Sequence, residues 1–511
     1  MLTLKYYETM SGLKDVPIPV IVGIAQYTHR LNSSDKDLHP LKIMSLVAKR
    51  AGEDAGLLTL SEVDTLYVVN ILSHQYANPP SMLAELLGIY PKETGYTGIG
   101  ACAPQWFVHQ AGRRIVNREA ELVLICGAEA FHARSKVLDL RQDLAKASTS
   151  RIVKMVGDLR QPSSEMELRY GLNLPVNIYP LFENALRAAK GISISKHRRE
   201  ITDFCARMSE IAAKNPYSWF QQPRTADEIY TVSDENRMIA FPYSKFMCSI
   251  MNVDQGAAVL MTSAQKAKSL GIPKDKFVYL RGCADASDIW FVSQRPRFYE
   301  SPSVHVAVKE ALKQASVSLD EISYFDFYSC FPCAPRITQR MLNLPEDDPR
   351  PLTGTGGMPY FGGPGNNYSL HAICRMVEIL RQEPESLGMV QALSWYISKH
   401  SVGIYSGTRG DRPWIPVDSE SYQRELDLIV GPEIVAEAKG EAYVETYTVI
   451  YDRQGFPAQG IIIGRQEDGR RFIAHSEQDQ DTLKLMTEEE LIGTRGTAGH
   501  QEATGLNLFK F

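Results

Sequence analysis

A helix–turn–strand pattern occurs twice in the chain, and this repetition restricts the fold more than any other feature. The first copy begins at Leu41 with LKIMSLVAKRAGEDAGLL and continues through TLSEVD into the apolar run TLYVVN. The second begins at Val304 with VHVAVKEALKQASVSLDEI and leads into SYFDFYSCF. Apolar strands that follow helices are typical of parallel sheets with helices on both faces. Because the copies are too far apart for a solenoid, the sequence predicts two similar α/β halves.

Further segments extend this α/β pattern between and after the two copies. ELVLICGAEA (121–130) is predicted to form a buried strand, and QGAAVLMTSAQKAKSLGI (255–272) a strand that runs into a short helix. GMVQALSWY and SVGIYSG are predicted to be two adjacent strands that close the second half. The stretch 132–248 is richer in Arg, Pro and Tyr and breaks the pattern. We interpret it as a lid inserted into the first half.

The C-terminal segment, from about 422 to 511, has a different pattern. EAYVETYTVIY and AQGIIIG are β-type runs, and Asp468-Gly469 between apolar runs is a strong hairpin signal. We predict a small OB-like β-barrel here. Residues 431–511 contain 8 basic and 14 acidic side chains, a net charge of −6. This charge disfavours nucleic acid as the ligand of the barrel and favours a docking or structural role.

The composition is that of an ordinary soluble globular protein. Of 511 residues, 44 % are hydrophobic and 23 % charged, with a net charge of −5. This balance gives no electrostatic support for a nucleic-acid or anionic-membrane partner. Eight cysteines are too sparse for a secreted disulfide framework, and no apolar run approaches the ~18 residues of a membrane span. With no apolar signal-peptide segment in 1–19, we expect a cytoplasmic protein.

The first candidate for chemistry is Cys102, in TGIGACAPQWFVHQAGRRIV. A Gly-rich turn ends at this cysteine, and Pro104 suits the first position of a helix. A Cys at a helix N-terminus lies in the positive end of the helix dipole, which stabilises the thiolate. The alternative interpretation is that Cys102 is simply a small residue in a tight turn.

Three other motifs contain reactive residue types. Cys330-Phe331-Pro332-Cys333 has CxxC spacing, but no thioredoxin-like unit precedes it and zinc would need two more ligands. A site at the carboxyl end of a sheet strand is the better interpretation. His371 and His400 are of a type that is more often a satisfied hydrogen-bonding group than a catalyst, although His400 follows a predicted strand end. The Gly-rich stretch LTGTGGMPYFGGPGNNYSLHAICRM matches no nucleotide-binding motif, so its backbone must approach some other group closely.

Taken in order, these motifs resemble the thiolase superfamily, the acetyl-CoA acetyltransferase family. VIVGIAQYTHR resembles its opening strand, GACAPQWFVHQAGRRI its nucleophile loop, and AAKNPYSWF its lid. NVDQGAAVLMTSAQKA resembles the end of the first half, FDFYSCFPCA the oxyanion-hole motif, and TGGMPYFGGPGNNYS the Gly-His-Pro loop. YTVIYDRQGFPAQGIIIGRQEDGRRFIAH resembles the additional C-terminal domain of a thiolase-like subgroup.

The resemblance implies two βαβαβαββ halves in an α/β/α/β/α layering. The first half would span 17–275 with the lid at 132–248, the second 276–415, and the OB-like domain 422–511. It also implies an acyl-CoA as the small-molecule substrate, with no bound cofactor and no metal. Arg134, Arg151 and Arg160 of the lid are candidates for holding CoA phosphates, although a solvated lid face is the better explanation of most of them. Both a homodimer and a monomer remain open.

In the resembled family a Cys accepts the acyl group, a His activates it and a second Cys moves a proton. Counting back from Gly127 without gaps places the nucleophile at Ala101, one residue before Cys102. The Gly-His-Pro element reads Gly362-Gly363-Pro364, and the second-Cys region VQALSWYISKHS contains no Cys. The oxyanion-hole position is Tyr328. Each loss removes a group worth orders of magnitude in rate, so thiolysis or condensation by the usual route is disfavoured.

Three functions fit this degenerate set. We favour an acyl-CoA-processing acyltransferase of lipid metabolism, with Cys102 as nucleophile, Cys330 or His400 as proton carrier, and Gly-loop N–H groups as oxyanion donors. A retro-aldol lyase acting on β-hydroxyacyl-CoA would use Tyr328 with Tyr360 or Tyr368 as base and acid. A non-catalytic CoA-binding or scaffold protein is the third. For the favoured function we expect a thioester cavity bordered by Cys102, Tyr328 and Gly363.

Overall fold

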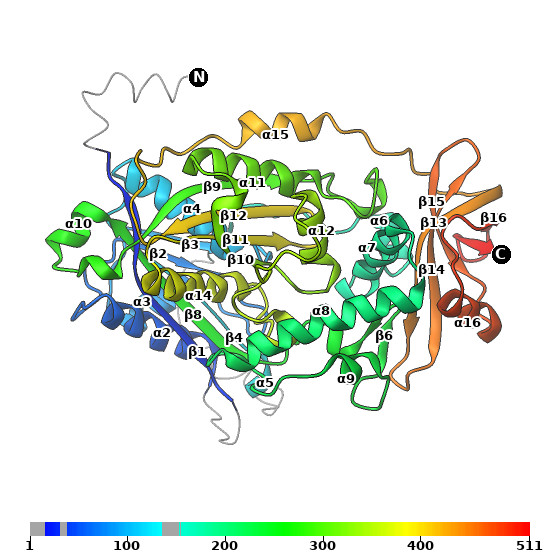
Figure 1. Cartoon of the computed structure of the whole chain (residues 1–511), viewed down its shortest axis with the longest axis horizontal. Coiled ribbons are helices and arrows are strands. Elements are labelled where there is room, and N and C mark those ends of the chain that lie inside the picture. The colour runs from blue at the N-terminus through cyan, green and yellow to red at the C-terminus, as the bar shows by residue number, and fades with distance from the viewer. Residues whose placement is uncertain (1–15, 31–37, 135–152, 154) are drawn as a thin grey trace.

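The protein's structure, a computed structural model, describes residues 16–30, 38–134, 153 and 155–511. Its main sheet contains strands of both predicted halves (Figure 1). The first half contributes β1 (Pro19–Thr28), β2 (Thr65–Val68), β3 (Glu93–Thr97), β4 (Leu122–Ala130) and β8 (Asp254–Ser263). The second contributes β9 (Val278–Ser287), β10 (Ile322–Phe327), β11 (Leu387–Ser394) and β12 (Lys399–Ser406).

The strand order confirms the duplication. The first half runs β3-β2-β4-β8-β1 and the second β9-β12-β11-β10, so the halves meet at their first strands. There Val20 lies opposite Tyr279 and Ile21 opposite Val278, in antiparallel register. In the described part of the chain, β3 has no counterpart in the second half. The predicted pair GMVQALSWY and SVGIYSG forms the antiparallel neighbours β11 and β12.

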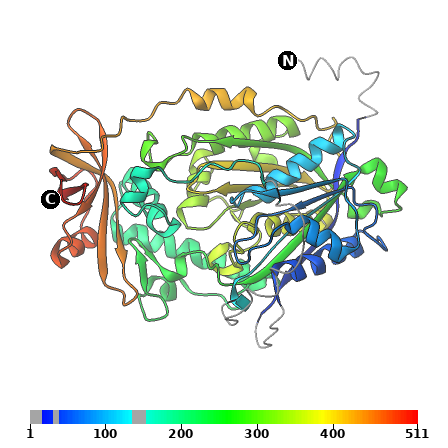
Figure 2. The same cartoon turned by 180° about the vertical axis from the view of Figure 1, so that it is seen from behind.

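Helices fill the layers on both sides of each half-sheet (Figures 1 and 2). The helices α4 (Ala103–Val116) and α14 (Tyr368–Gln382) share one hydrophobic core with strands of both halves. The helices α2 (Pro40–Asp54) and α11 (Pro302–Ala315), which belong to the two repeats, cover the outer faces. A Cβ built at Gly23 would lie 2.1 Å from the carbonyl oxygen of Ala51, and one at Gly282 2.1 Å from that of Ala311. Both halves therefore use a glycine to bring helix and strand together.

The remaining elements of the halves are short. They are α3 (Pro79–Leu87), α10 (Ala264–Ser269), α12 (Cys333–Met341), α13 (Met358–Phe361), and 3₁₀ turns at Lys274–Lys276, Val292–Gln294 and Leu319–Glu321. No helix among the described residues combines the length and apolar character needed to cross a bilayer.

The lid contains most of the irregular structure. Its elements are α5 (Phe131–Arg134), β5 (Met155–Val156), α6 (Glu165–Arg169), α7 (Pro175–Lys190), α8 (Ile194–Lys214), α9 (Ala226–Tyr230), β6 (Met238–Ala240), β7 (Tyr243–Ser244) and a 3₁₀ turn at Lys245–Met247. The short strand β5 pairs in parallel with β3, the outermost strand of the first half. A lid strand therefore covers this edge of the main sheet.

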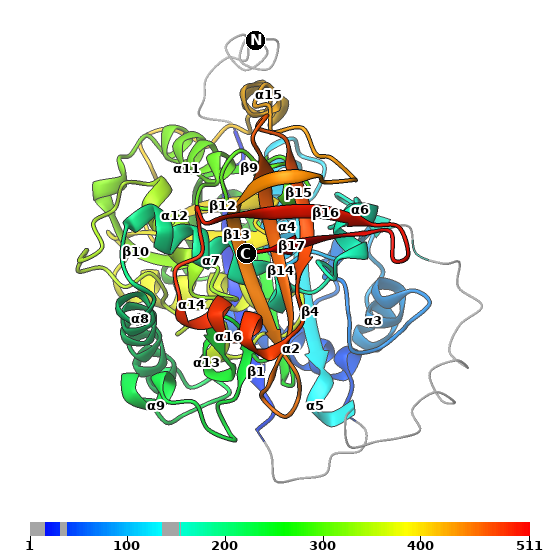
Figure 3. The same ribbon diagram turned by 90° about the vertical axis from the view of Figure 1, so that its right-hand side faces the viewer.

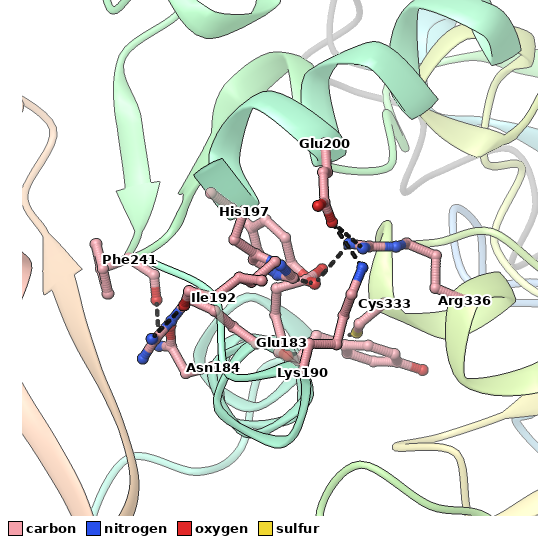
Figure 4. A network of polar contacts seen from close by, with 12 residues as sticks. Glu183, Asn184, Lys190, Ile192, His197, Glu200, Phe241, Cys333 and Arg336 are labelled. Atoms are coloured by element: carbon pink, nitrogen blue, oxygen red, sulfur yellow. Dashed lines mark hydrogen bonds and ion pairs between the residues drawn. The ribbon is translucent and has the colours of Figure 1, made fainter. Parts of the chain in front are cut away.

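A buried carboxylate holds the lid against the second half (Figure 4). Glu183 on α7 accepts hydrogen bonds from Nε2 of His197 at 2.7 Å and from the hydroxyl of Tyr243 at 2.6 Å. Arg336 on α12 donates to the same carboxylate at 3.2 Å. Burial alone would raise the pKa of Glu183, but these three partners hold it below its usual value. The network therefore joins two lid helices, a lid strand and the second half.

The C-terminal segment forms the predicted barrel (Figure 3). Its strands β13 (Gly440–Tyr451), β14 (Pro457–Gln466), β15 (Arg471–Ser476), β16 (Arg495–Gln501) and β17 (Leu506–Lys510) close through the pairing of β13 with β14, and α16 (Gln480–Glu488) packs beside them. Asp468-Gly469 forms the turn between β14 and β15, with φ of +86° at Gly469, which confirms the hairpin. The helix α15 (Glu420–Asp427) lies in the connection from the second half.

Among the contacts that attach the barrel to the rest of the chain, one joins it to the lid and another to the second half. Strand β6 of the lid pairs with β13, with Ala240 opposite Ile450. The buried guanidinium of Arg471 donates to the backbone carbonyls of Ser293 and Arg295, both at 2.6 Å. The barrel is therefore continuous with the lid sheet and fixed to the second half.

Candidate functional site

Cys102 lies at the N-terminus of α4, as predicted, and is 6 % exposed. Its backbone N–H donates to Oγ of Ser394, at the end of β11, at 2.8 Å. The thiol residue borders a cavity of about 420 Å³ whose charged and nucleophilic lining includes Cys102, Asp158, Arg160, Asp285, Lys399 and His400. The cavity lies at the ends of β3 and β9 and at the start of β12, whose residues Lys399, His400 and Ser401 border it.

Lys399 brings a positive charge next to the loop that contains Cys102. A Cβ built at Gly100 would lie 3.3 Å from Nζ of Lys399 and 2.9 Å from Oγ of Ser394. A side chain at Gly100 would therefore displace both groups. The ammonium group donates to the carbonyl of Asp158 at 3.4 Å. Lys399 therefore places a cation beside the Gly-rich turn that leads into α4.

A buried ion pair lies under the floor of the cavity. Nδ1 of His109, which is on the same face of α4 as Cys102, lies 2.9 Å from Oδ1 of Asp285. Burial alone would lower the pKa of His109, but the adjacent carboxylate outweighs burial and raises it to about 10. Nε2 of His109 and the hydroxyl of Tyr405 lie 2.9 and 2.6 Å from the same end of the Gln105 amide. This buried pair therefore lies beneath the cavity, which Asp285 borders.

His400 borders the same cavity, but both of its ring nitrogens are engaged. The backbone N–H of Tyr328 donates to Oε1 of Gln391 at 3.2 Å, which turns the amide nitrogen toward Nδ1 of His400 at 2.8 Å. Nε2 lies 3.0 Å from Oγ of Ser301, whose proton goes to Oδ2 of Asp288 at 2.5 Å. The ring therefore carries its proton on Nε2 and is neutral.

Burial lowers the pKa of His400 to about 4. A neutral imidazole could accept a proton in principle, but its Nδ1 lone pair already accepts from Gln391. The role of His400 as proton carrier remains a prediction, and it would require that hydrogen bond to break.

Tyr328 and Cys330 do not border the cavity that contains Cys102. The ring of Tyr328 packs edge-on against Tyr368, with centroids 5.5 Å apart. Burial and the neighbours Cys330, Tyr368 and Cys102 raise its pKa well above the usual value. Burial likewise raises the pKa of Cys330 to about 12. Tyr328 thus lies near Cys102 but in the packed interior. Neither Tyr328 nor Cys330 has the lowered pKa of an activated base or nucleophile.

The Gly-rich loop is also packed. A Cβ at Gly363 would lie 2.2 Å from Oγ of Ser249, so a histidine at this position would displace that serine. The N–H of Gly363 donates to the carbonyl of Ile250 at 2.8 Å, and that of Gly365 to the carbonyl of Gly363 at 2.7 Å. These two amides are therefore not free to bind an oxyanion.

Neighbouring loop residues are equally enclosed. A Cβ at Gly362 would lie 2.3 Å from Oε1 of Gln255. Pro364 accepts from the N–H of Asn367 at 2.8 Å, and Tyr360 is buried with its hydroxyl unpaired among the described residues. The structure thus brings Cys102 and His400 to one cavity and leaves Tyr328, Gly363 and this loop outside it, which differs from the expected three-residue border.

Ala101 and Cys102 face different surroundings, and this explains why the observed border of the cavity differs from the expected one. Ala101 belongs to the hydrophobic core that includes Tyr328, Cys330 and Phe331, whereas Cys102 borders the cavity. The position that the ungapped count assigns to the nucleophile therefore faces the packed interior. The thiol, one residue later, faces another direction.

The lid arginines have mixed positions. Arg160 borders the cavity, pairs with Asp158 and stacks 3.7 Å from the ring centroid of Trp290. Arg134 donates to the carbonyl of Ser73, and Arg151 lies outside the described residues.

Sequence reasoning missed three residues of the cavity region: His109, Asp285 and Lys399. The sequence contained a signal for each of these residues. His109 follows Cys102 by two helical turns, which places it on the same face of the helix. Asp285 lies near the end of a buried strand, and Lys399 precedes His400 in the stretch SKHS.

Comparisons with known proteins agree with this architecture. Residues 421–503 match the thiolase-like protein type 1 additional C-terminal domain. The crystal structure of a monomeric SCP2-thiolase-like protein type 1 from Mycobacterium smegmatis is 35 % identical, with a TM-score of 0.84 over 97 % of this chain and 99 % of that one. The chain belongs to this type 1 family of the thiolase superfamily.

Other relatives of this thiolase-like protein are more distant. An acetyl-CoA acetyltransferase of Methanocaldococcus jannaschii is 22 % identical over 55 % of this chain, and the match spans 65 % of that enzyme's length. The structure of the Ltp2–ChsH2(DUF35) aldolase has a TM-score of 0.60 at 19 % identity, and covers 76 % of this chain and 98 % of that one. These two likenesses support the thiolase fold.

Proposed function

We propose that this thiolase-like protein is an acyltransferase that carries its acyl group as a thioester on Cys102. The observation that supports this most directly is the position of Cys102, at a helix N-terminus on the border of a 420 Å³ cavity. The Cys102 thiolate would attack the carbonyl carbon of an acyl-CoA. The carbon–sulfur bond to CoA would break, and the CoA thiolate would leave and take up a proton. Transfer to an acceptor would free Cys102 again.

The surrounding residues suit this step. The hydrogen bond from Cys102 N–H to Ser394 fixes the loop, and the ammonium of Lys399 would stabilise both the thiolate and the oxyanion. No step is assigned to the Gly-rich loop, since the amides of Gly363 and Gly365 already have backbone acceptors. We place the reaction in the acyl-CoA metabolism of the cytoplasm, consistent with eight free cysteines.

A non-catalytic CoA-binding protein is the second candidate. Two observations favour it. The space at Gly363 is filled, so this position has no room for the histidine of the usual thiolase reaction, and both ring nitrogens of the neutral His400 are already hydrogen-bonded. The retro-aldol lyase has less support. It needs a tyrosine of lowered pKa, and burial raises the pKa of Tyr328 and of Tyr360 well above the usual value.

The decisive experiment is intact-mass analysis after incubation with acetyl-CoA and longer acyl-CoAs. We expect one acyl adduct on the native chain, none on Cys102→Ala, and an unchanged adduct on Cys330→Ala, whose thiol lies outside the cavity. Absence of an adduct with every thioester, combined with a thermal shift on CoA binding, would establish the binding protein instead. Adduct formation by Cys102→Ala would refute the assigned nucleophile.

We further propose that the protein is a monomer. Strand β5 pairs with the edge strand β3, with Met155 opposite Tyr96 and Val156 opposite Thr97, and so occupies backbone groups that a second copy would need. The relative from Mycobacterium smegmatis is described as monomeric. Sedimentation at micromolar concentration tests this, and a stable dimer would contradict it.

A further inference from the structure

Asp285 presents one unpaired carboxylate oxygen at the cavity. Its Oδ1 accepts from Nδ1 of His109 at 2.9 Å and from Oγ of Ser401 at 2.6 Å. Among the described residues, Oδ2 has no hydrogen-bond partner, and the side chain is 21 % exposed. A carboxylate oxygen accepts more than one hydrogen bond, so Oδ2 has its full capacity available to a ligand.

The structure keeps this carboxylate ionised and fixed in place. Burial alone would raise the pKa of Asp285, but His109 and Ser401 hold it below its usual value. The two other carboxylates of the inner lining have internal partners. Asp158 pairs with Arg160, and Asp288 accepts from Oγ of Ser301 at 2.5 Å and from the N–H of Ser303 at 2.9 Å.

Two more acidic residues, Glu420 and Asp427, border the cavity from the connecting helix α15, where both are exposed. Water solvates exposed carboxylates well, so they discriminate weakly between ligands. Asp285 is therefore the one inner carboxylate, among the described residues, that offers a fixed and unoccupied acceptor.

We propose that Asp285 determines the substrate class of this cavity by accepting a hydrogen bond from a hydroxyl or ammonium group at the far end of the acyl chain. This inference rests on the proposed function, since it takes Cys102 as the site of the thioester. Cys102 and His109 are seven positions apart on α4, about 10 Å at ~1.5 Å per residue. The donor group would thus lie several carbons from the thioester, on an acyl chain of medium length.

The selection follows from desolvation. A donor on the chain replaces the water that it removes from Oδ2, whereas a methyl terminus leaves a carboxylate oxygen desolvated and unpaired. Hydrogen bonds to charged groups are the stronger kind, so we expect a preference of about ten- to a hundredfold for chains with a donor.

The test uses amide analogues of the thioester, which bind without reacting. Hexanoyl, terminally hydroxylated hexanoyl and terminally aminated hexanoyl pantetheine amides would be titrated against the full-length protein by calorimetry. Tighter binding of the hydroxyl or the amino analogue than of plain hexanoyl supports the proposal, and the stronger of the two identifies the donor. Equal binding of all three, or no binding up to millimolar concentration, overturns it.

Variants separate this proposal from the proposed function. Asp285→Asn keeps the shape of the side chain but can present an amide donor at the cavity, so we expect the preference for donor-bearing chains to disappear. Asp468→Asn, a matched change on the exposed hairpin of the barrel, should keep the preference. Binding does not require Cys102, so a Cys102→Ala protein should show the same order of affinities even if no acyl adduct forms in any assay. A preference that persists in Asp285→Asn refutes the role of Asp285.

Discussion

The carboxylate of Glu183 is expected to contribute more to stability than any exposed ion pair of the lid. It is fully buried and accepts from His197, Tyr243 and Arg336. Glu183→Gln would leave the guanidinium of Arg336 without its buried counter-charge and would place amide hydrogens against existing donors. Removing one partner of a buried charged pair costs about 3–5 kcal/mol, so we expect a loss of that size.

Glu200 offers a matched control within the same network (Figure 4). Its carboxylate accepts from Lys190 at 2.6 Å and lies 3.4 Å from Arg336, but its side chain is 30 % exposed. Exposed pairs contribute about 0–1 kcal/mol, so Glu200→Gln should cost far less than Glu183→Gln. Urea unfolding monitored by far-UV circular dichroism gives both values.

The pH dependence provides a second check on the same residue. The pKa of Glu183 is lowered in the folded state, so its contribution is present above the unfolded pKa of about 4.3 and is lost as the pH falls through the lower folded value. Glu183→Gln should remove this part of acid sensitivity. Equal losses of stability for the two glutamine variants would refute the reasoning.

Two further predictions concern the cavity and the Gly-rich loop. Gly363→His restores the family histidine but must displace Ser249, so we expect about 1–3 kcal/mol of destabilisation and no gain in thiolysis, measured by urea unfolding and a CoA-release assay; a gain in thiolysis would contradict the packed loop. The pKa of His109 is raised to about 10, so the stability from its pair with Asp285 is complete below the unfolded pKa of about 6.5 and is lost as the pH rises toward 10. Thermal midpoints of the native chain should therefore fall over this interval, and those of His109→Gln should fall less; parallel curves would show that the pair is not ionic.

Sequence reasoning predicted most of the fold because the repeated segments carry local signals. Two helical stretches, each followed by a turn and an apolar strand, sufficed to identify α2 with β2 and α11 with β10. The hairpin at Asp468-Gly469 was likewise a local signal. The pairing of β5 with β3 was not predictable, because two residues of strand carry no periodicity.

The site was harder to predict because direction and packing decide it. A sequence shows that Cys102 follows a Gly-rich turn, but not that Ala101 faces the core while Cys102 faces a cavity. Similarly, His400 in a strand gives no sign that Gln391 and Ser301 occupy both of its nitrogens. These facts depend on residues that are distant in the chain and come together only in the folded molecule.

The pairing of β6 with β13 has a consequence for how the molecule can be divided. A deletion of everything after α15 would remove the strand that pairs with Ala240. It would also remove Arg471, which donates a hydrogen bond to the carbonyl of Ser293 in the second half. The C-terminal barrel thus supports the lid and is not an independent domain on a flexible linker. Any movement of the lid would have to move the barrel with it.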